Sequence, residues 1–369
     1  MASQIRTDGA RPLRARVTIS QVADALGLTK GTVSRALNGY PDISPSTRVR
    51  VQAQAQRMGY RPLAQAQAIR TGRSRAIGLV LQTDVPGAQR PFLSDFLAGI
   101  TRALSAESWT LTLSTSPGGA EMLTTLERLV DERKADGFIL PRTFAQDARM
   151  RLLREMDVPF VLYGRVEDPD GCAWFDILGE DAMRAAVARL AGHGHTRIGF
   201  VNGGTEYNFS RLREGGFLAG LDSHGFPQDP TLIRRNAMTR QAGAAAVESL
   251  LAEPGPPTAI VFAVDAAALG AYDAAQRLGL RIGRDLSIIS YDGIPEGGFV
   301  DPPLTTFHVD SRMAGARLAE LLIRRIGGAA PETLRETAEA DLRVGGSDGP
   351  PAHRSEALAR MLSAPPTTD

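Results

Sequence analysis

The first sixty residues carry apolar positions three and four residues apart, which is the spacing of helices that bury one face. We predict three short helices, at about Ile19–Leu26, Lys30–Leu37 and 45–58. Their expected inward side chains are Val22, Ala25, Leu26, Val33, Ala36, Leu37, Val49, Val51, Ala53 and Met58. Because only a short glycine-containing turn joins the first two, the pattern predicts a helix-turn-helix.

Residues suited to capping stand at the ends of these helices. Thr18 and Gln21 have the spacing of a capping box, in which each side chain bonds the other's backbone amide. Thr29 can cap the second helix, and Ser44 followed by Pro45 begins the third. A glycine closes each helix, so we expect compact ends.

The second helix is predicted to present small or basic side chains opposite its buried face. Lys30, Gly31, Ser34 and Arg35 lie there, so the helix axis can approach the floor of a nucleic-acid groove. Its N-terminus adds amide donors for a phosphate, and Lys30 and Arg35 can donate to guanine O6 and N7. The alternative interpretation is a helix face that meets only solvent.

Residues 64–69 follow as an alanine- and glutamine-rich segment that is too short to be a stable helix alone. It can form against a copy of itself and DNA, with Ile69 wedged between base pairs in the minor groove. Composition alone favours a flexible linker instead.

From about residue 76 the pattern changes to short apolar runs that alternate with helical stretches. This alternation predicts parallel sheets with helices on both faces. Four runs before residue 166 fit one lobe, and three runs between residues 196 and 293 fit a second. Ligands in such sheets bind at the carboxyl ends of the strands. The residues there are Gln82, Thr83, Asp84, Tyr163, Gly164, Arg165, Asn202, Gly203, Val264, Asp265, Tyr291 and Asp292.

Length and composition narrow the class of protein. The 369 residues, 43% of them apolar, are enough for two or three cores. No apolar run reaches the ~18 residues of a membrane span, and the basic N-terminus lacks the apolar stretch of a secretory signal. A single cysteine, Cys172, excludes an internal disulfide and a thiolate metal cluster. We therefore expect a cytoplasmic protein that makes no membrane contact.

Charge is distributed unevenly along the chain. Residues 1–75 hold thirteen Lys or Arg against three Asp or Glu, whereas the remainder holds 29 against 38. A basic, compact head on an acidic body fits an anionic polymer as partner. The alternative is a globular protein with a basic tail.

Enzyme motifs are absent from the sequence. It contains no P-loop, no G-x-G-x-x-G after a strand and no H-E-x-x-H, and no G-x-S-x-G elbow leads from an apolar run into a helical stretch. His193 and His195 lack a third nearby ligand, so we predict no metal, no cofactor and no catalytic residue. A transport-type binding protein would match the body but not the basic head.

The stretch "VTISQVADALGLTKGTVSRALNG…ISPSTRVRVQAQAQRMGYRP" closely resembles the LacI/GalR family of bacterial transcription regulators, and the resemblance continues to about Leu342. It implies a lambda-repressor-like helix-turn-helix followed by an α/β, two-lobed, periplasmic-binding-protein-like core with parallel sheets. The expected parts are a basic arm (1–16), the helix-turn-helix domain (17–62), a hinge segment (63–75), an effector-binding and dimerisation domain (76–344) and a mobile tail (345–369), with a short helix possible over Ser355–Leu362.

This resemblance also implies which residues meet DNA. The positions are Thr18, Thr29, Lys30, Gly31, Thr32, Ser34, Arg35, Asn38, Tyr60, Ala66 and Ile69. Two of them depart from the family. Gly31 removes a side chain where many members read a base, so discrimination should shift to Lys30 and Arg35. Ile69 stands where the family usually has leucine, and its β-branch can change the fit.

In the body, the resemblance places a small effector between the lobes. The implied contacts are Gln82, Asp84, Arg165, Arg213, Met238, Asp265 and Asp292. Arg213, in "SRLREGGF", offers a guanidinium fork for vicinal hydroxyls or a carboxylate, and Asp292, in "ISYDG", can accept from two sugar hydroxyls. The alternative for Arg213 is a surface salt bridge, and the alternative for Asp292 is a role as a loop or cap residue. Val264 replaces a polar residue of the family, which leaves room for a less hydroxylated ligand.

The function that follows is a repressor of sugar uptake or catabolism genes. A homodimer would bind a palindromic double-stranded operator at the nucleoid under allosteric control by a sugar such as a glucoside or disaccharide. A nucleobase or other metabolite as corepressor, or an activator of the same architecture, is the alternative. The C-terminal region lacks a leucine heptad, which favours a dimer over a tetramer.

Overall fold

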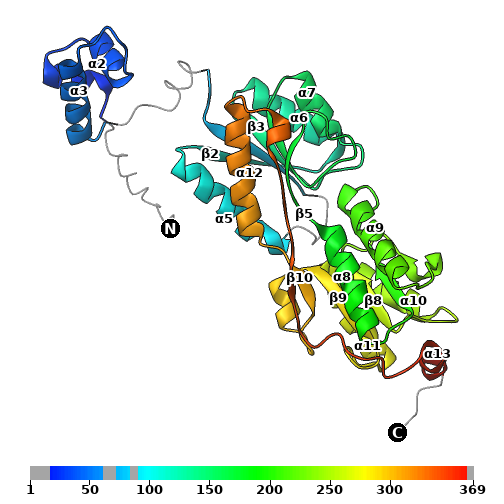
Figure 1. Cartoon of the computed structure of the whole chain (residues 1–369). Helices are drawn as coiled ribbons and strands as arrows, with labels where there is room; N and C mark the ends of the chain where they lie inside the picture. The colour runs from blue at the N-terminus through cyan, green and yellow to red at the C-terminus, as the bar shows by residue number, and fades with distance from the viewer. Residues whose placement is uncertain (1–16, 61–71, 84–89, 364–369) are drawn as a thin grey trace, which may run out of the picture. The chain divides into compact units, whose positions relative to one another are not determined.

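The computed structural model describes residues 17–60, 72–83 and 90–363 of the chain (Figure 1). The chain divides into two compact units, Met1–Ser74 and Arg75–Asp369. The predicted basic arm, most of the predicted hinge segment, Ala66, Ile69 and Asp84 lie outside the described residues.

The first unit is built from the three predicted helices, α1 (Ile19–Leu26), α2 (Lys30–Leu37) and α3 (Pro45–Met58). The capping box at the start of α1 is present: Gln21 N donates to Thr18 Oγ1 at 3.3 Å, and Thr18 N donates to Gln21 Oε1 at 2.9 Å. The buried core of the unit consists of Val22, Ala23, Val33, Ala36, Ile43, Val51 and Ala55.

The predicted inward faces of α1 and α3 need correction. Ala25, Val49 and Ala53 are exposed, and Val49 keeps 64% of its surface. Val51 is buried as predicted, and Ala55, which was not predicted to point inward, is buried too. Residues two apart on a helix point roughly 200° apart, so burying Val51 turns Val49 away from the core. Alanine and glutamine alternate from Gln52 to Gln56 in α3, which leaves the apolar pattern too weak to fix its face.

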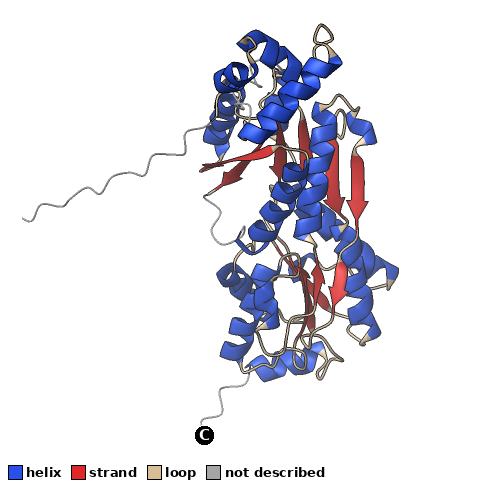
Figure 2. Ribbon diagram, turned by 90° about the vertical axis from the view of Figure 1, so that its left-hand side faces the viewer, coloured by secondary structure: helices blue, strands red, loops and turns tan. Residues whose placement is uncertain are grey.

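Lobe 1 of the second unit is a parallel sheet covered by helices on both faces (Figure 2). Its strand order is β11-β5-β4-β3-β1-β2. The strands are β1 (Ala76–Gln82), β2 (Thr110–Ser116), β3 (Gly137–Pro141), β4 (Phe160–Tyr163), β5 (Ala173–Ile177) and β11 (Arg335–Ala338). The helices are α5 (Arg90–Ala106), α6 (Gly119–Asp131), α7 (Ala148–Glu155) and α12 (Ser311–Ile326). Ile139 packs towards α5 and α12, whereas its neighbours Phe138 and Leu140 pack towards α6 and α7.

Lobe 2 repeats this architecture with the strand order β12-β10-β9-β8-β6-β7. Only β12 runs antiparallel to its neighbour. The strands are β6 (Ile198–Val201), β7 (Ile233–Arg234), β8 (Ala259–Phe262), β9 (Ser287–Asp292), β10 (Thr306–His308) and β12 (Asp341–Arg343). The helices α8 (Gly179–Gly192) and α9 (Asn208–Ser223) pack together, as do α10 (Arg240–Leu251) and α11 (Asp265–Leu278). Short 3₁₀ turns occupy Pro230–Leu232, Pro295–Gly298 and Pro331–Thr333.

The chain crosses between the lobes three times within residues 90–363. The crossings lie between β5 and α8, between β10 and α12, and between β11 and β12. The seven apolar runs of the sequence are strands of the two lobes as predicted. The prediction missed β5, β7, β10, β11 and β12, which are short or partly exposed.

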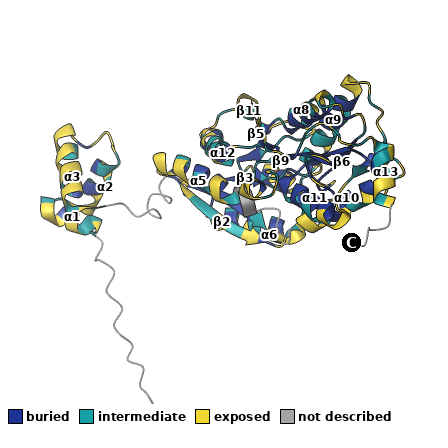
Figure 3. Cartoon of the chain, turned by 90° about the horizontal axis from the view of Figure 1, so that it is seen from below, coloured by how far each residue is buried: buried dark blue, intermediate teal, exposed yellow. Residues whose placement is uncertain are grey.

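The segment expected to be a mobile tail packs against lobe 2 as far as Ser363. Ser347 is fully buried, and its Oγ donates to Ile288 O and accepts from Thr305 N, both at 2.8 Å. The Asp348 carboxylate accepts from Arg189 Nε at 2.6 Å. The helix α13 (Ser355–Ser363) then buries Leu358. Gly, Pro and Ala composition suggested mobility, but buried and satisfied polar groups anchor this segment. Figure 3 shows α13 beside the rest of lobe 2.

Candidate functional site

The outer face of α2 is accessible in the first unit. Lys30, Gly31 and Arg35 are exposed, and Thr32 and Ser34 are half-buried. A Cβ added to Gly31 would meet nothing closer than an oxygen at 3.8 Å, so packing does not require glycine there. The missing side chain therefore changes what this face can contact, not how the helix packs.

Several predicted DNA contacts already have partners inside this unit. Thr29 Oγ1 accepts from Thr32 N at 3.1 Å as the N-cap of α2. Asn38 Nδ2 donates to Ser34 O at 2.7 Å at the end of the same helix. Thr18 caps α1, and Tyr60 packs against the core. These residues therefore have structural roles inside the unit as well.

Arg35 forms an ion pair on the exposed face of α2. Its Nη1 lies 3.1 Å from Asp42 Oδ2, with both side chains about half exposed. An exposed pair of this kind contributes little to folding stability. The guanidinium is therefore available to another acceptor if Asp42 releases it.

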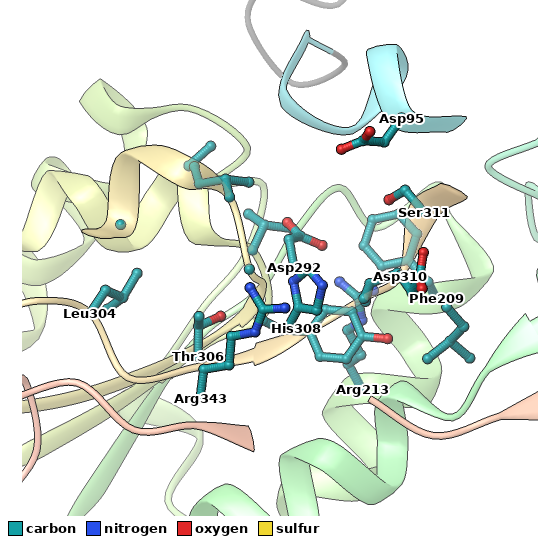
Figure 4. Close-up of a pocket in the computed structure, with 18 of the residues that line it drawn as sticks. Asp95, Phe209, Arg213, Asp292, Leu304, Thr306, His308, Asp310, Ser311 and Arg343 are labelled. Atoms are coloured by element: carbon teal, nitrogen blue, oxygen red, sulfur yellow. The ribbon is translucent and has the colours of Figure 1, made fainter. Parts of the chain in front are cut away.

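A pocket of about 850 Å³ lies between the lobes of the second unit (Figure 4). Lobe 1 and lobe 2 both contribute polar and aromatic side chains to it. Its lining includes Arg142, Tyr163, Arg165, Phe209, Arg213, Met238, Val264, Tyr291, Asp292, Thr306, His308, Asp310 and Arg343. Such a mixture suits a polar ligand that also has apolar faces.

Arg213 is held rigidly at one wall of this pocket by α9. Its Nη1 donates to Ala263 O at 2.6 Å, and its guanidinium lies 3.9 Å from the Tyr291 ring centroid and 4.6 Å from that of Phe209. Its buried Nε has no hydrogen-bond partner among the described residues. Two aromatic faces and one carbonyl therefore orient the fork before a ligand arrives.

Asp292 ends β9 beside Arg213 in a strained conformation. Its φ is +130°, which a residue with a Cβ rarely adopts. Val309 N donates to its carbonyl at 3.1 Å and helps to hold the backbone. Burial raises the pKa of Asp292 to about 7, although Arg213 opposes the rise. Strain and a perturbed carboxyl in one pocket residue are typical of a functional site.

Arg142 is another arginine that lines this pocket. Burial lowers the pKa of its guanidinium, and Tyr207 and Asp292 counteract that shift. Arg142 also has a positive φ, +53°. Arg142 lies directly after β3, at the carboxyl end of a predicted strand. The sequence analysis did not include it among the candidate ligand contacts, although its position indicates that role.

Asp265 does not line the pocket, contrary to expectation. Its fully buried carboxylate accepts from Gly293 N at 2.7 Å, Ile294 N at 2.9 Å and Thr306 Oγ1 at 2.7 Å. Asp265 therefore holds the backbone of the loop that follows Asp292. Its neighbour Val264 does line the pocket and offers only apolar surface there.

The other predicted effector contacts divide into two groups. Met238 and Arg165 line the pocket, but the Arg165 guanidinium is already paired with Asp176, at 2.5 Å, and with Glu180. Gln82 lines a separate cavity of about 20 Å³ and not this pocket. Sequence reasoning missed Phe209, His308, Asp310 and Arg343. His308 and Arg343 belong to β10 and β12, which the apolar pattern did not predict.

The chain has clear relatives among known proteins. Residues 18–62 match the model of the bacterial regulatory proteins of the lacI family, and residues 187–347 match a periplasmic binding protein-like domain. The HTH-type transcriptional regulator RafR of Escherichia coli is 35% identical over 87% of this chain and 95% of its own length. The regulator AglR of Rhizobium meliloti (strain 1021) is 34% identical over 92% of this chain and 96% of its own.

Solved structures agree with these relatives. The lac repressor dimer bound to operator and the anti-inducer ONPF has a TM-score of 0.75 and 26% identity, covering 90% of this chain and 99% of that one. The complex of the regulator CelR with cellobiose has a TM-score of 0.70 and 28% identity, covering 90% of this chain and 100% of that one.

These similarities establish the class of protein, a DNA-binding transcriptional regulator and not an enzyme, as the sequence predicted. The chain belongs to the lacI family of bacterial regulatory proteins. Its fold, a helix-turn-helix unit and a two-lobed core with parallel sheets, also confirms the prediction. No described helix is long and apolar enough to cross a membrane.

Proposed function

We propose that this chain is a repressor that binds a palindromic operator as a homodimer, and that a sugar in the pocket between the lobes changes its affinity for that operator. The observation that carries the effector role is the juxtaposition of Arg213 and Asp292. One supplies an oriented fork of donors, and the other supplies a carboxylate that can accept from two hydroxyls.

The ligand we favour is a glucoside or disaccharide. A pocket of about 850 Å³ exceeds the space that a single hexose ring needs, and the side chains of Phe209 and Met238 offer apolar surface for the faces of a sugar. CelR was solved with cellobiose, which agrees with a ligand of this size in a related pocket. Val264 reduces the number of polar contacts on one wall.

For the operator, the proposed reading surface is the outer face of α2. Lys30 and Arg35 would donate to base edges beside Thr29, while Thr32 and Ser34 would contact phosphates. The lac repressor was solved as a dimer on its operator, which supports the same assembly here. Ala66 and Ile69, outside the described residues, remain proposed minor-groove contacts. The proposed location is the cytoplasm, at the nucleoid.

A thermal-shift panel tests the effector proposal directly. The full-length protein would be heated with monosaccharides, disaccharides, sugar phosphates and purines, each also tested on Arg213→Ala. A ligand at a hundredfold excess over its Kd stabilises the folded protein by about 2.7 kcal/mol. We expect a disaccharide to raise the Tm of the parent protein and to have no effect on Arg213→Ala.

A matched control is Arg240→Ala. Arg240 pairs with Asp273 on the surface of lobe 2 and does not line the pocket, so this variant should respond to the ligand as the parent does. A purine response that disappears in Arg213→Ala would replace the sugar with a nucleobase. A response that survives Arg213→Ala would place the ligand elsewhere and contradict the proposed site.

A further inference from the structure

The two lobes also touch through a contact that is separate from the three chain crossings. On lobe 1 it involves the segment directly after β3, and on lobe 2 the segment directly before α9. Ala145 N donates to Glu206 O at 3.0 Å, and Asn208 N donates to Thr143 O at 2.9 Å. Backbone bonds in both directions join two segments that lie more than sixty positions apart in the chain.

Aromatic rings reinforce this contact. Phe144 and Tyr207 face each other as an isolated antiparallel bridge, with ring centroids 5.2 Å apart. Tyr207 is buried, and its other neighbour is the ring of the pocket residue Phe209, at 5.4 Å. Asn208 Nδ2 also donates to Arg165 O at 2.6 Å, which adds a third bond between the lobes. We call residues 143–145 and 206–208 together the latch.

The lobe 1 half of the latch is held in place by Arg149. This buried arginine pairs with Asp147 at 2.6 Å and donates to the carbonyls of Pro141 and Arg142, both at 3.1 Å. Its guanidinium also lies 4.9 Å from the ring centroid of Phe144. The segment is therefore anchored within lobe 1, independently of lobe 2.

We propose that the latch holds the two lobes closed around the pocket before an effector arrives, and that Arg149 is the positioning residue for its lobe 1 half. The crossings join the lobes covalently, and contacts beyond the crossings, which also include the ion pair of Arg211 with Glu167, contribute to the closed fraction. The latch is such a contact, and Arg142 and Phe209 place it at the edge of the pocket. Apparent ligand affinity depends on the fraction of protein in the binding-competent state.

Spin-label distances in the free protein test this proposal. Glu127→Cys on α6 and Gln276→Cys on α11 put exposed labels on different lobes. The native Cys172 is fully buried, which shields it from the label. Double electron–electron resonance on full-length labelled protein, diluted with unlabelled protein, gives the distribution between the lobes. We expect one dominant distance in the parent.

Phe144→Leu and Tyr207→Leu remove the ring stacking but keep apolar side chains. Each should lower the ratio of closed to open protein by about two- to tenfold. The double variant should lose less than the product of the two single effects, because both changes delete the same contact. Arg149→Lys keeps the charge but lacks the fork, so it should shift the ratio in the same direction.

Phe217→Leu is the matched control. It removes a ring that stacks on Phe200 at 4.6 Å inside lobe 2, so it should leave the distance between the lobes unchanged. Unchanged distances in both latch variants, or an equal change in Phe217→Leu, would overturn the proposal. The latch proposal depends on the proposed function only where it concerns the affinity for the effector. Because the distances are measured without ligand, an unresponsive sugar panel and an inert latch are separate results.

Discussion

Asp292 combines a positive φ with a carboxyl whose pKa burial raises to about 7. In the unfolded chain the same carboxyl has a pKa near 3.9. Between these values the folded protein binds more protons than the unfolded chain, so the free energy of unfolding falls as the pH rises from about 4 to about 7. Above that window the contribution of Asp292 no longer changes with pH.

The variant Asp292→Asn should therefore be more stable than the parent at pH 8, by about 1–3 kcal/mol, and should gain less at pH 5. Asparagine keeps the shape of the side chain but never ionises, so it removes the cost of a carboxylate in the pocket. Urea unfolding at both pH values measures the difference. Glu127→Gln, on the exposed face of α6, controls for the change in net charge. An equal gain at both pH values would contradict the assignment.

At the scale of elements, α2 exposes Arg35, and Asp42 pairs with its guanidinium. If Arg35 reads a guanine, Arg35→Ala should cost about 1–3 kcal/mol of operator binding and relax specificity at one base pair. Fluorescence anisotropy on operators with single base-pair changes measures both effects. A uniform loss across all operators would show that Arg35 contacts only phosphate.

Asp42→Asn tests the same element from the other side. It frees the guanidinium and removes a negative charge, so operator affinity should rise about two- to fivefold with little change in Tm, because exposed ion pairs are weak. Asp24→Asn, on an exposed position of α1, removes an equal charge without touching Arg35. A rise of the same size in Asp24→Asn would mean that only the net charge matters.

Elements with strong local signals could be predicted from the sequence, and elements fixed by distant partners could not. Thr18 and Ser44 indicate the start of a helix because each side chain caps it through the amide three residues further on. The strand β12 has three exposed residues and exists because it pairs with β10. The segment after it is anchored by Ser347, whose partners lie more than forty positions earlier. The local sequence around β12 and Ser347 does not indicate these distant partners.

The same distinction applies to the pocket. Arg213 and Asp292 were predictable because the family pattern and the ends of strands identify them. Arg343 reaches the pocket only after the chain has crossed between the lobes for the third time, which no local pattern reveals. Asp265 shows the opposite error: it follows a strand, but its carboxylate turns inward to bind the loop after Asp292. A position after a strand therefore indicates a neighbourhood, and packing decides which side chains face the ligand.

At the scale of the whole molecule, the effector and the operator must influence each other equally. If the effector changes operator affinity by some factor, the operator changes effector affinity by the same factor, and typical values are about 5–150-fold. We expect a factor in this range, because a ligand that binds one arrangement of the lobes more tightly shifts the protein towards the operator affinity of that arrangement. Anisotropy with and without effector gives one value, and calorimetric titration of effector with and without operator gives the other.

Arg213→Ala separates this linkage from a nonspecific effect of the ligand. The variant should bind operator like the parent in the absence of effector, because its altered side chain lies in the pocket between the lobes. Adding effector should then change nothing. Equal factors near one in the parent would mean that the pocket does not regulate DNA binding. Unequal factors would require a third linked equilibrium, such as dissociation of the proposed dimer, because two-site linkage alone is reciprocal.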